Sequence, residues 1–214
     1  MRVVRLLLIL SAIVLSAALT VAMLPAQDRG TPPQRGGAAA GGRGGGPAMA
    51  LTTSAWPDGD PIPVKYTQAG EQVSPELKWS NAPAGTQSFV LHMHDPDVAQ
   101  NRGTEDQVHW LVWNIPATAT GLPENVPAGA SLQDGSQQIS ATGPQYRGPG
   151  APATGPQHHY TLEIYALDTK LDAQRSSNAQ PGPAAVETRT IVMKAMQGHV
   201  LGKAVYVGLF RRPQ

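Results

Sequence analysis

Four polar residues near the ends of predicted strands carry the side chains that a small anion-binding site needs. They are Asp95, His109, His158 and Tyr160. Imidazole and phenol groups donate hydrogen bonds, and a neighbouring carboxylate orients an imidazole and favours its charged form. A loop rich in Gly and Pro, residues 143–152, stands beside them in the sequence and lets backbone N–H groups approach a ligand. If the fold brings these groups together, they predict a pocket for phosphate or a carboxylate.

A metal site is the alternative for the same part of the chain. His92 and His94 form an H-x-H pair on one face of a predicted strand, a spacing that can bind a metal. Asp95 and His109 are the candidates for further ligands. Against this, the sequence has no second cluster with a recognised zinc spacing, and residues opposite an apolar strand face are often simply exposed. We therefore expect no metal and no cofactor.

The sequence offers little support for an enzyme. A Ser-His-Asp hydrolase needs its nucleophile in a strained turn such as G-x-S-x-G, and that motif is missing. Ser136 follows Gly135 in a polar turn without that context. Glu163 and Asp168 fit the solvent edge of a strand better than a catalytic carboxylate pair. We expect a binding protein.

Short strands must position these residues. Alternating apolar positions and Pro or Gly stops predict strands at residues 63–66, near Trp79, and at 88–95, 109–115, 158–168 and 205–210. Residues 116–157 are poor in regular structure, and a helix is predicted over 186–197 with Gly198 as its stop. Many short strands with turn signals and one helix indicate a mainly β domain.

Composition divides the chain into three parts. Residues 1–26 have two arginines and then an apolar run, which is typical of a secretory signal peptide, although the run is long enough for an uncleaved anchor. Residues 27–50 form a Gly/Ala/Pro-rich flexible linker, and residues 51–214 form the folded domain. We therefore expect an exported protein, periplasmic or extracellular, that touches a membrane only if the N-terminal segment stays attached.

Net charge and cysteine content exclude further classes of protein. Removal of residues 1–26 lowers the 16 basic side chains to 14, against 15 acidic ones, so the mature charge is about −1. A nucleic-acid-binding protein would show a basic stripe, which is missing here. The chain has no Cys, so it has neither disulfides nor thiol chemistry.

Several motifs occur in a fixed order along the predicted domain. They are Ser74-Pro75-x-Leu77-x-Trp79, Asp95-Pro96-Asp97, His109-Trp110, Gly148-Pro149 followed by Pro152, His158-x-Tyr160 and Gly198-His199-Val200-Leu201. This pattern resembles the phosphatidylethanolamine-binding protein family, in particular its bacterial Raf-kinase-inhibitor-like branch. The resemblance covers residues 51–210.

The resemblance implies a Greek-key β domain of two antiparallel sheets with a few peripheral helices. It also implies a pocket for phosphate, acetate or a phosphoryl head group. By motif, its ligand-binding residues here are Asp95, His109, Gly148, Pro149, Pro152, His158 and Tyr160. The expected partner is a small anionic ligand, with no nucleic acid and any protein partner unknown. The alternatives are a secreted interaction or inhibitor module that does not use the pocket, and a metal-dependent hydrolase with His92, His94 and His109 as ligands.

Overall fold

The computed structural model describes residues 47–214, apart from the side chain of Asn101. The predicted signal segment, 1–26, and most of the predicted linker lie outside the described residues. Within the described range, no helix combines the length and apolar character needed to cross a membrane. The last linker residues belong to the folded domain, since Met49 packs against the core and Ala50 pairs with Ser80.

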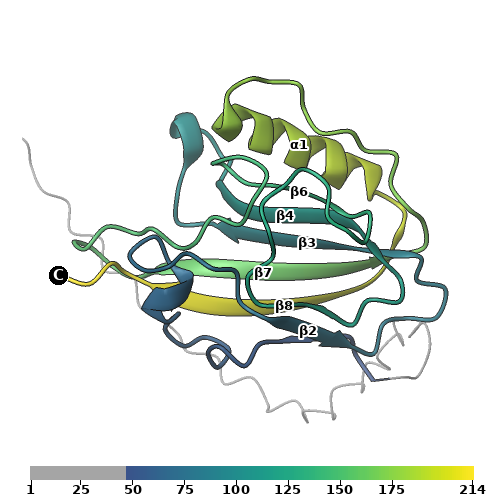
Figure 1. Cartoon of the computed structure of the whole chain (residues 1–214), viewed down its shortest axis with the longest axis horizontal. Coiled ribbons are helices and arrows are strands. Elements are labelled where there is room, and N and C mark those ends of the chain that lie inside the picture. The colour runs from purple at the N-terminus through teal and green to yellow at the C-terminus, as the bar shows by residue number, and fades with distance from the viewer. Residues whose placement is uncertain (1–46) are drawn as a thin grey trace, which may run out of the picture. The chain divides into compact units, whose positions relative to one another are not determined.

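Two antiparallel sheets form the domain (Figure 1). The larger sheet has the strand order β6-β4-β3-β7-β8, and the smaller one has the order β1-β2-β5. The strands are β1 (Ala50–Thr52), β2 (Leu77–Ser80), β3 (Ser88–Asp95), β4 (Gln107–Pro116), β5 (Gly121–Leu122), β6 (Gln137–Ile139), β7 (His158–Leu167) and β8 (Val200–Phe210). The prediction of a mainly β fold with two antiparallel sheets is confirmed.

The long strands of the five-stranded sheet are buried on both faces. On β3, Phe89, Leu91 and Met93 belong to the core that lies between the two sheets, whereas Val90 belongs to a second core on the opposite face. Side chains alternate between the faces of a strand, so the position of a residue decides which core it meets. The polar residues that continue these strands are therefore divided between two sides of one sheet.

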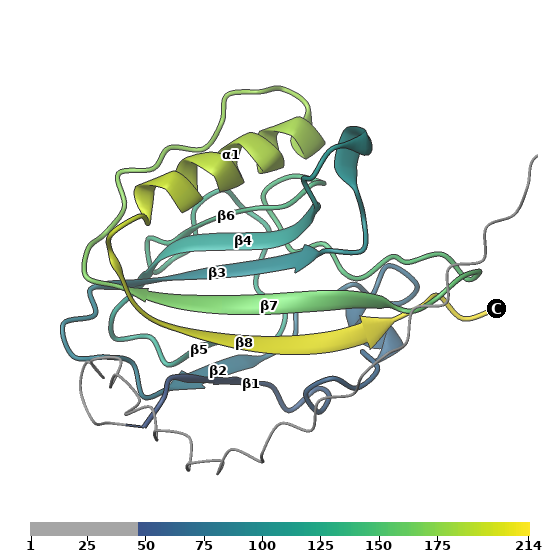
Figure 2. The same cartoon turned by 180° about the vertical axis from the view of Figure 1, so that it is seen from behind.

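Helix α1 (Pro181–Ala195) covers the second face of the five-stranded sheet (Figure 2). It packs Ala184, Ala185 and Val192 against this sheet. The predicted bounds, 186–197, were wrong at both ends. Proline is favoured in the first turn because its missing N–H is not needed there, so the helix begins at Pro181. Gly198 follows the last turn with a φ of 84° and ends the helical segment, as predicted.

Three other predicted elements need correction. Residues 63–66 do not form a strand, because Val64–Tyr66 makes a 3-10 turn, η1, in which the Thr67 hydroxyl donates to the Val64 carbonyl at 2.9 Å. Strand β8 begins at Val200, well before residue 205. The segment predicted to be irregular contains the short strands β5 and β6, which are held by pairing with β2 and β4.

Candidate functional site

The predicted polar residues meet at one end of the five-stranded sheet, the end where the C-terminus leaves in Figure 1. Asp95 ends β3, His109 lies near the start of β4, and His158 and Tyr160 open β7. They surround a cavity of about 110 Å³. Its lining consists of Gln68, Asp95, Val98, Gln107, His109, Arg147, Gly150, Ala151, Pro152, His158 and Tyr160. Five of the seven residues assigned by resemblance therefore lie together.

A β-bulge brings His109 to this cavity. Trp110 pairs with Met93 and Val108 pairs with His94, so His109 is the extra residue on β4. A bulge re-aims the side chain of its extra residue. With strict alternation, His109 would lie on the same face of β4 as Leu111, two residues further on. Leu111 packs in the core under α1. In the structure its ring instead packs edge-on against Tyr160, at 5.0 Å between ring centroids.

His158 is oriented by a buried carboxylate. Its Nδ1 donates to Asp95 Oδ2 at 2.9 Å, and the other oxygen of Asp95 accepts the backbone N–H of Asp97 at 3.0 Å. Asp95 is only 2% exposed. Because a carboxylate can only accept, the hydrogen bond places a proton on Nδ1 and leaves Nε2 of His158 for a ligand.

His109 is held in a similar way by a carbonyl group. Its Nδ1 donates to the backbone oxygen of Arg147 at 2.9 Å. Burial lowers the pKa of His109 to about 4, so the ring is neutral at neutral pH. With Nδ1 as the donor, Nε2 carries the lone pair and accepts hydrogen bonds in this state.

Tyr160 joins the cavity to the Gly/Pro-rich loop. Its hydroxyl oxygen accepts the backbone N–H groups of Gly150 and Ala151, both at 3.1 Å. Burial, together with the charge of Asp95, raises the pKa of Tyr160 to about 12, so the hydroxyl keeps a proton that it can donate. Two of the loop amides that the sequence suggested for the ligand are thus already bonded to Tyr160.

Gly148 and Pro149 support the cavity without lining it. The carbonyl of Gly148 accepts Nε2–H of Gln68 at 2.7 Å, and the carbonyl of Pro149 accepts the Gln68 backbone N–H at 2.9 Å. A Cβ atom at position 148 would overlap the carbonyl oxygen of Tyr66. A glycine is needed here because two backbone segments pass in close contact.

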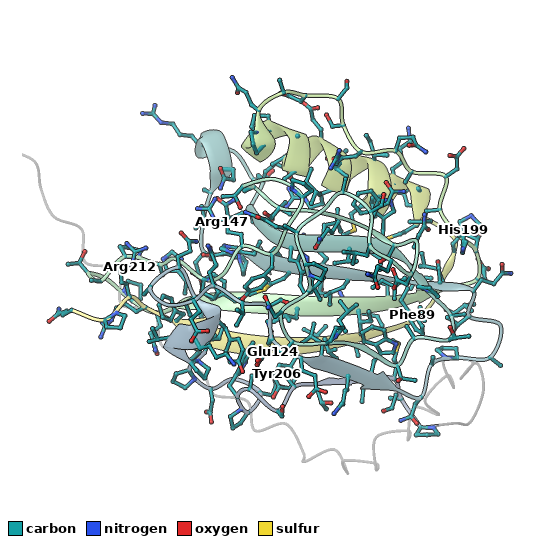
Figure 3. All side chains as sticks on the ribbon, viewed as in Figure 1. Phe89, Glu124, Arg147, His199, Tyr206 and Arg212 are labelled. Atoms are coloured by element: carbon teal, nitrogen blue, oxygen red, sulfur yellow. The ribbon has the colours of Figure 1, made fainter. Side chains whose placement is uncertain are left out.

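Arg147 is the charged cavity residue that the sequence analysis did not assign to the site. It lies near the start of β4, at the same end of the molecule as Arg212, whereas His199 lies at the opposite end (Figure 3). Its Nε is buried and makes no hydrogen bond to any of the residues that the structure describes. A guanidinium group is permanently charged and suits the binding of carboxylate or phosphate. In the sequence, the signal that could have identified Arg147 was its position directly before Gly148-Pro149.

The metal alternative with His92, His94 and His109 is wrong. His109 lines the cavity, whereas His92 and His94 lie on the other face of the sheet, beside Glu163 and Arg189. Residues opposite an apolar strand face are often exposed, but His92 is not, since it is only 4% exposed. These two histidines belong to a separate cluster.

A β domain of two antiparallel sheets with a small polar cavity at the strand ends defines the class of this protein. Residues 52–211 match the family model described as phosphatidylethanolamine-binding protein, so the chain belongs to that family, as the sequence motifs predicted. A UPF0098 protein of Methanothermobacter thermautotrophicus is 42% identical over 166 residues, which cover 77% of this chain and 99% of that protein.

Solved structures agree with this assignment. The crystal structure of a putative phosphatidylethanolamine-binding protein homologue from Chlamydia trachomatis is 30% identical, with a TM-score of 0.62, and the match covers 77% of this chain and 98% of the other. E. coli YbcL has a TM-score of 0.63 at 23% identity, over 78% of this chain and 99% of its own, and shares the fold.

Proposed function

We propose that this chain binds a small anion of the size of phosphate in the cavity between Asp95 and Tyr160. The observation that carries the proposal is that Arg147, His109, His158 and Tyr160 line one cavity of about 110 Å³. A water molecule occupies about 30 Å³ in the liquid, so this space has room for three or four waters. A phosphate, a carboxylate or the phosphoryl end of a head group fits that volume, whereas a whole lipid does not.

Binding of the anion requires a proton as well. His109 and His158 both use Nδ1 to donate to a fixed acceptor, so each ring reaches the ligand through Nε2. A neutral ring presents a lone pair there, which repels a fully ionised oxygen and accepts from a protonated one. The anion is therefore bound either by a ring that gains a proton, in which case affinity rises as the pH falls, or through its own O–H group, which hydrogen phosphate already carries near neutral pH.

The proposal places this binding outside the cytoplasm. Residues 1–26 support it, because a charged start followed by an apolar run is typical of an exported chain. The ligand would then be a free anion or a head group that is accessible from the exported side of the membrane. No chemical conversion is required, and we expect binding without turnover.

The test is a titration of the full chain with phosphate and with phosphorylethanolamine, followed by the histidine ring signals in NMR. We expect saturable shifts at His109 and His158 and at least a tenfold loss of affinity in Arg147→Gln. Arg212→Gln is the matched control, because it removes an exposed arginine at the same end of the molecule. It should bind within twofold of the wild type.

Sulfate distinguishes a proton taken up by a histidine ring from a proton carried by the ligand, because sulfate stays fully ionised over the whole pH range of the titration. If a ring takes up the proton, sulfate affinity rises as the pH falls, by up to tenfold for each pH unit. If the ligand supplies it, phosphate binds without that dependence on a ring, and sulfate, which has no O–H group, binds weakly at every pH. Absence of any shift at millimolar phosphate refutes the proposal, and the chain would then be tested as an interaction module.

A further inference from the structure

A second polar cluster lies on the opposite face of the five-stranded sheet, away from the anion cavity. His92 and His94 come from β3, and Glu163 of β7 pairs in register with His92. The two imidazole rings are stacked, with their centroids 4.5 Å apart and their planes within 5° of parallel. Each of the three residues offers one ligand atom, and these atoms lie within 4.8 Å of one another.

One ring nitrogen of each histidine in this cluster lacks a hydrogen-bond partner among the described residues. His92 Nε2 and His94 Nε2 are buried and make no hydrogen bond there. Glu163 Oε2 faces both rings and lies 3.9 Å from His92 Nδ1 and 3.8 Å from His94 Nε2. These distances exceed hydrogen-bond range. Buried polar groups are normally satisfied, so the unpartnered His94 Nε2, which faces Glu163 Oε2 at 3.8 Å, calls for an atom between the two.

We propose that His92, His94 and Glu163 bind a divalent transition-metal ion, with Zn²⁺ as the ion that suits these ligands. Imidazole nitrogen binds zinc at about 2.0–2.1 Å and carboxylate oxygen at about 2.0–2.2 Å, so neighbouring ligand atoms around a tetrahedral ion are about 3.4 Å apart. The observed separations of 3.8 and 3.9 Å are only slightly wider. The third separation, between the two ligating nitrogens, is at most 4.8 Å, so binding would also require the stacked rings to tilt toward the ion and close by up to about 1.4 Å.

The surrounding residues orient the ligands as the outer groups of a metal site do. His94 Nδ1 donates to Asp106 Oδ2 at 2.5 Å, so the lone pair is on Nε2. A carboxylate that accepts from the second nitrogen of a ligating histidine is typical of zinc sites. Asp106 is held in turn by Arg189 of α1. The Tyr165 hydroxyl donates to Glu163 Oε2 at 2.7 Å.

Charge and access both allow a cation at this position. Glu105 and Asp106 pair with Arg189, and Glu163 pairs with Lys203, so three carboxylates face two cations. The remaining negative charge favours a bound cation. The cluster borders an open depression of about 270 Å³ that reaches solvent, so an ion can enter and a water molecule can occupy its fourth position.

The test begins with the full chain, stripped of metal by a chelator and titrated with Zn²⁺ by calorimetry. We expect one ion per chain and a loss of more than 100-fold in affinity for His92→Asn and His94→Asn. Asp106→Asn should lose between about 10- and 100-fold, as outer-shell partners usually do. His199→Asn replaces an exposed histidine at the far end of the molecule and should bind within twofold of the wild type.

A measurement on the wild type keeps the test valid if a variant fails to fold. Zn²⁺ should shift the ring nitrogen signals of His92 Nδ1 and His94 Nε2 in NMR while those of His199 stay in place. No binding at millimolar Zn²⁺ overturns the proposal. Asp95, Asp97 and His158 form another group of possible ligands. Loss of zinc in His158→Asn but not in His94→Asn would move the ion there and overturn the proposal as well.

Discussion

Replacement of His109 by asparagine should remove a large part of the acid sensitivity of this protein. The ring is 2% exposed and donates through Nδ1 to the Arg147 carbonyl at 2.9 Å. The amide group of asparagine is neutral over the whole pH range and can donate to the same carbonyl. His109→Asn therefore removes the titration while it keeps the hydrogen bond.

The size of the effect follows from the two protonation states. The pKa of His109 falls from its ordinary value of 6.5 to about 4 because the ring is buried. Between these values the unfolded chain binds a proton that the folded chain does not, so stability falls as the pH falls. The stabilisation is complete above about pH 6.5 and is lost as the pH approaches about 4. At about 1.4 kcal/mol for each pH unit, the loss is about 3 kcal/mol.

The assay is urea unfolding of the wild type and His109→Asn near pH 7.5 and near pH 4.5, in a buffer without phosphate, sulfate or carboxylate ions. We expect the wild type to lose about 2–3 kcal/mol more than the variant between the two conditions. His199→Asn controls for the loss of an exposed histidine. Parallel pH profiles for the wild type and His109→Asn would refute the view that a buried neutral imidazole lines the cavity.

Two further substitutions test how the wall of the cavity is held. Gly148→Ala should destabilise the fold by about 1–3 kcal/mol and weaken phosphate binding, because the new Cβ overlaps the backbone of Tyr66. Gly182→Ala is the control, since this glycine lies in an uncrowded position of α1. It should be neutral or stabilising in the same unfolding assay. Tyr160→Phe should cost about 1–3 kcal/mol, because the N–H groups of Gly150 and Ala151 lose their acceptor. Unchanged stability in Gly148→Ala would refute the close backbone contact, and unchanged stability in Tyr160→Phe would show that these amides do not depend on the hydroxyl.

The long strands were predictable because their signals are local. Apolar residues at every second position mark β3 and β7, and prolines mark the ends of the strands. The short strands β5 and β6 have only two and three residues, and they exist because β2 and β4 supply their hydrogen bonds. No pattern within so few residues distinguishes them from a loop. The start of α1 was missed because its first turn contains Gly182 and two prolines.

The site was predictable only in part. The motifs supplied the polar residues, but nothing local showed that Gly148 and Pro149 act through backbone contacts with Gln68. The partners of the H-x-H pair were assigned by nearness in the sequence, whereas the structure sets Glu163 beside it across the β3–β7 pairing. Cross-strand register depends on the whole sheet, so it could not be inferred from either strand alone.

The bulge at His109 explains why one strand can serve two sites. His94 and Asp95 are consecutive and point to opposite faces of the sheet, so β3 supplies one residue to the cluster of His92, His94 and Glu163 and the next to the cavity beside Tyr160. A strictly alternating β4 would have carried His109 to the side of Leu111, which is the side of His92 and His94. Because His109 is the extra residue opposite Met93 and His94, its side chain turns to the other side of the sheet, next to Tyr160. The chemistry at this end of the sheet therefore depends on one irregularity in strand pairing, which no periodic reading of the sequence could contain.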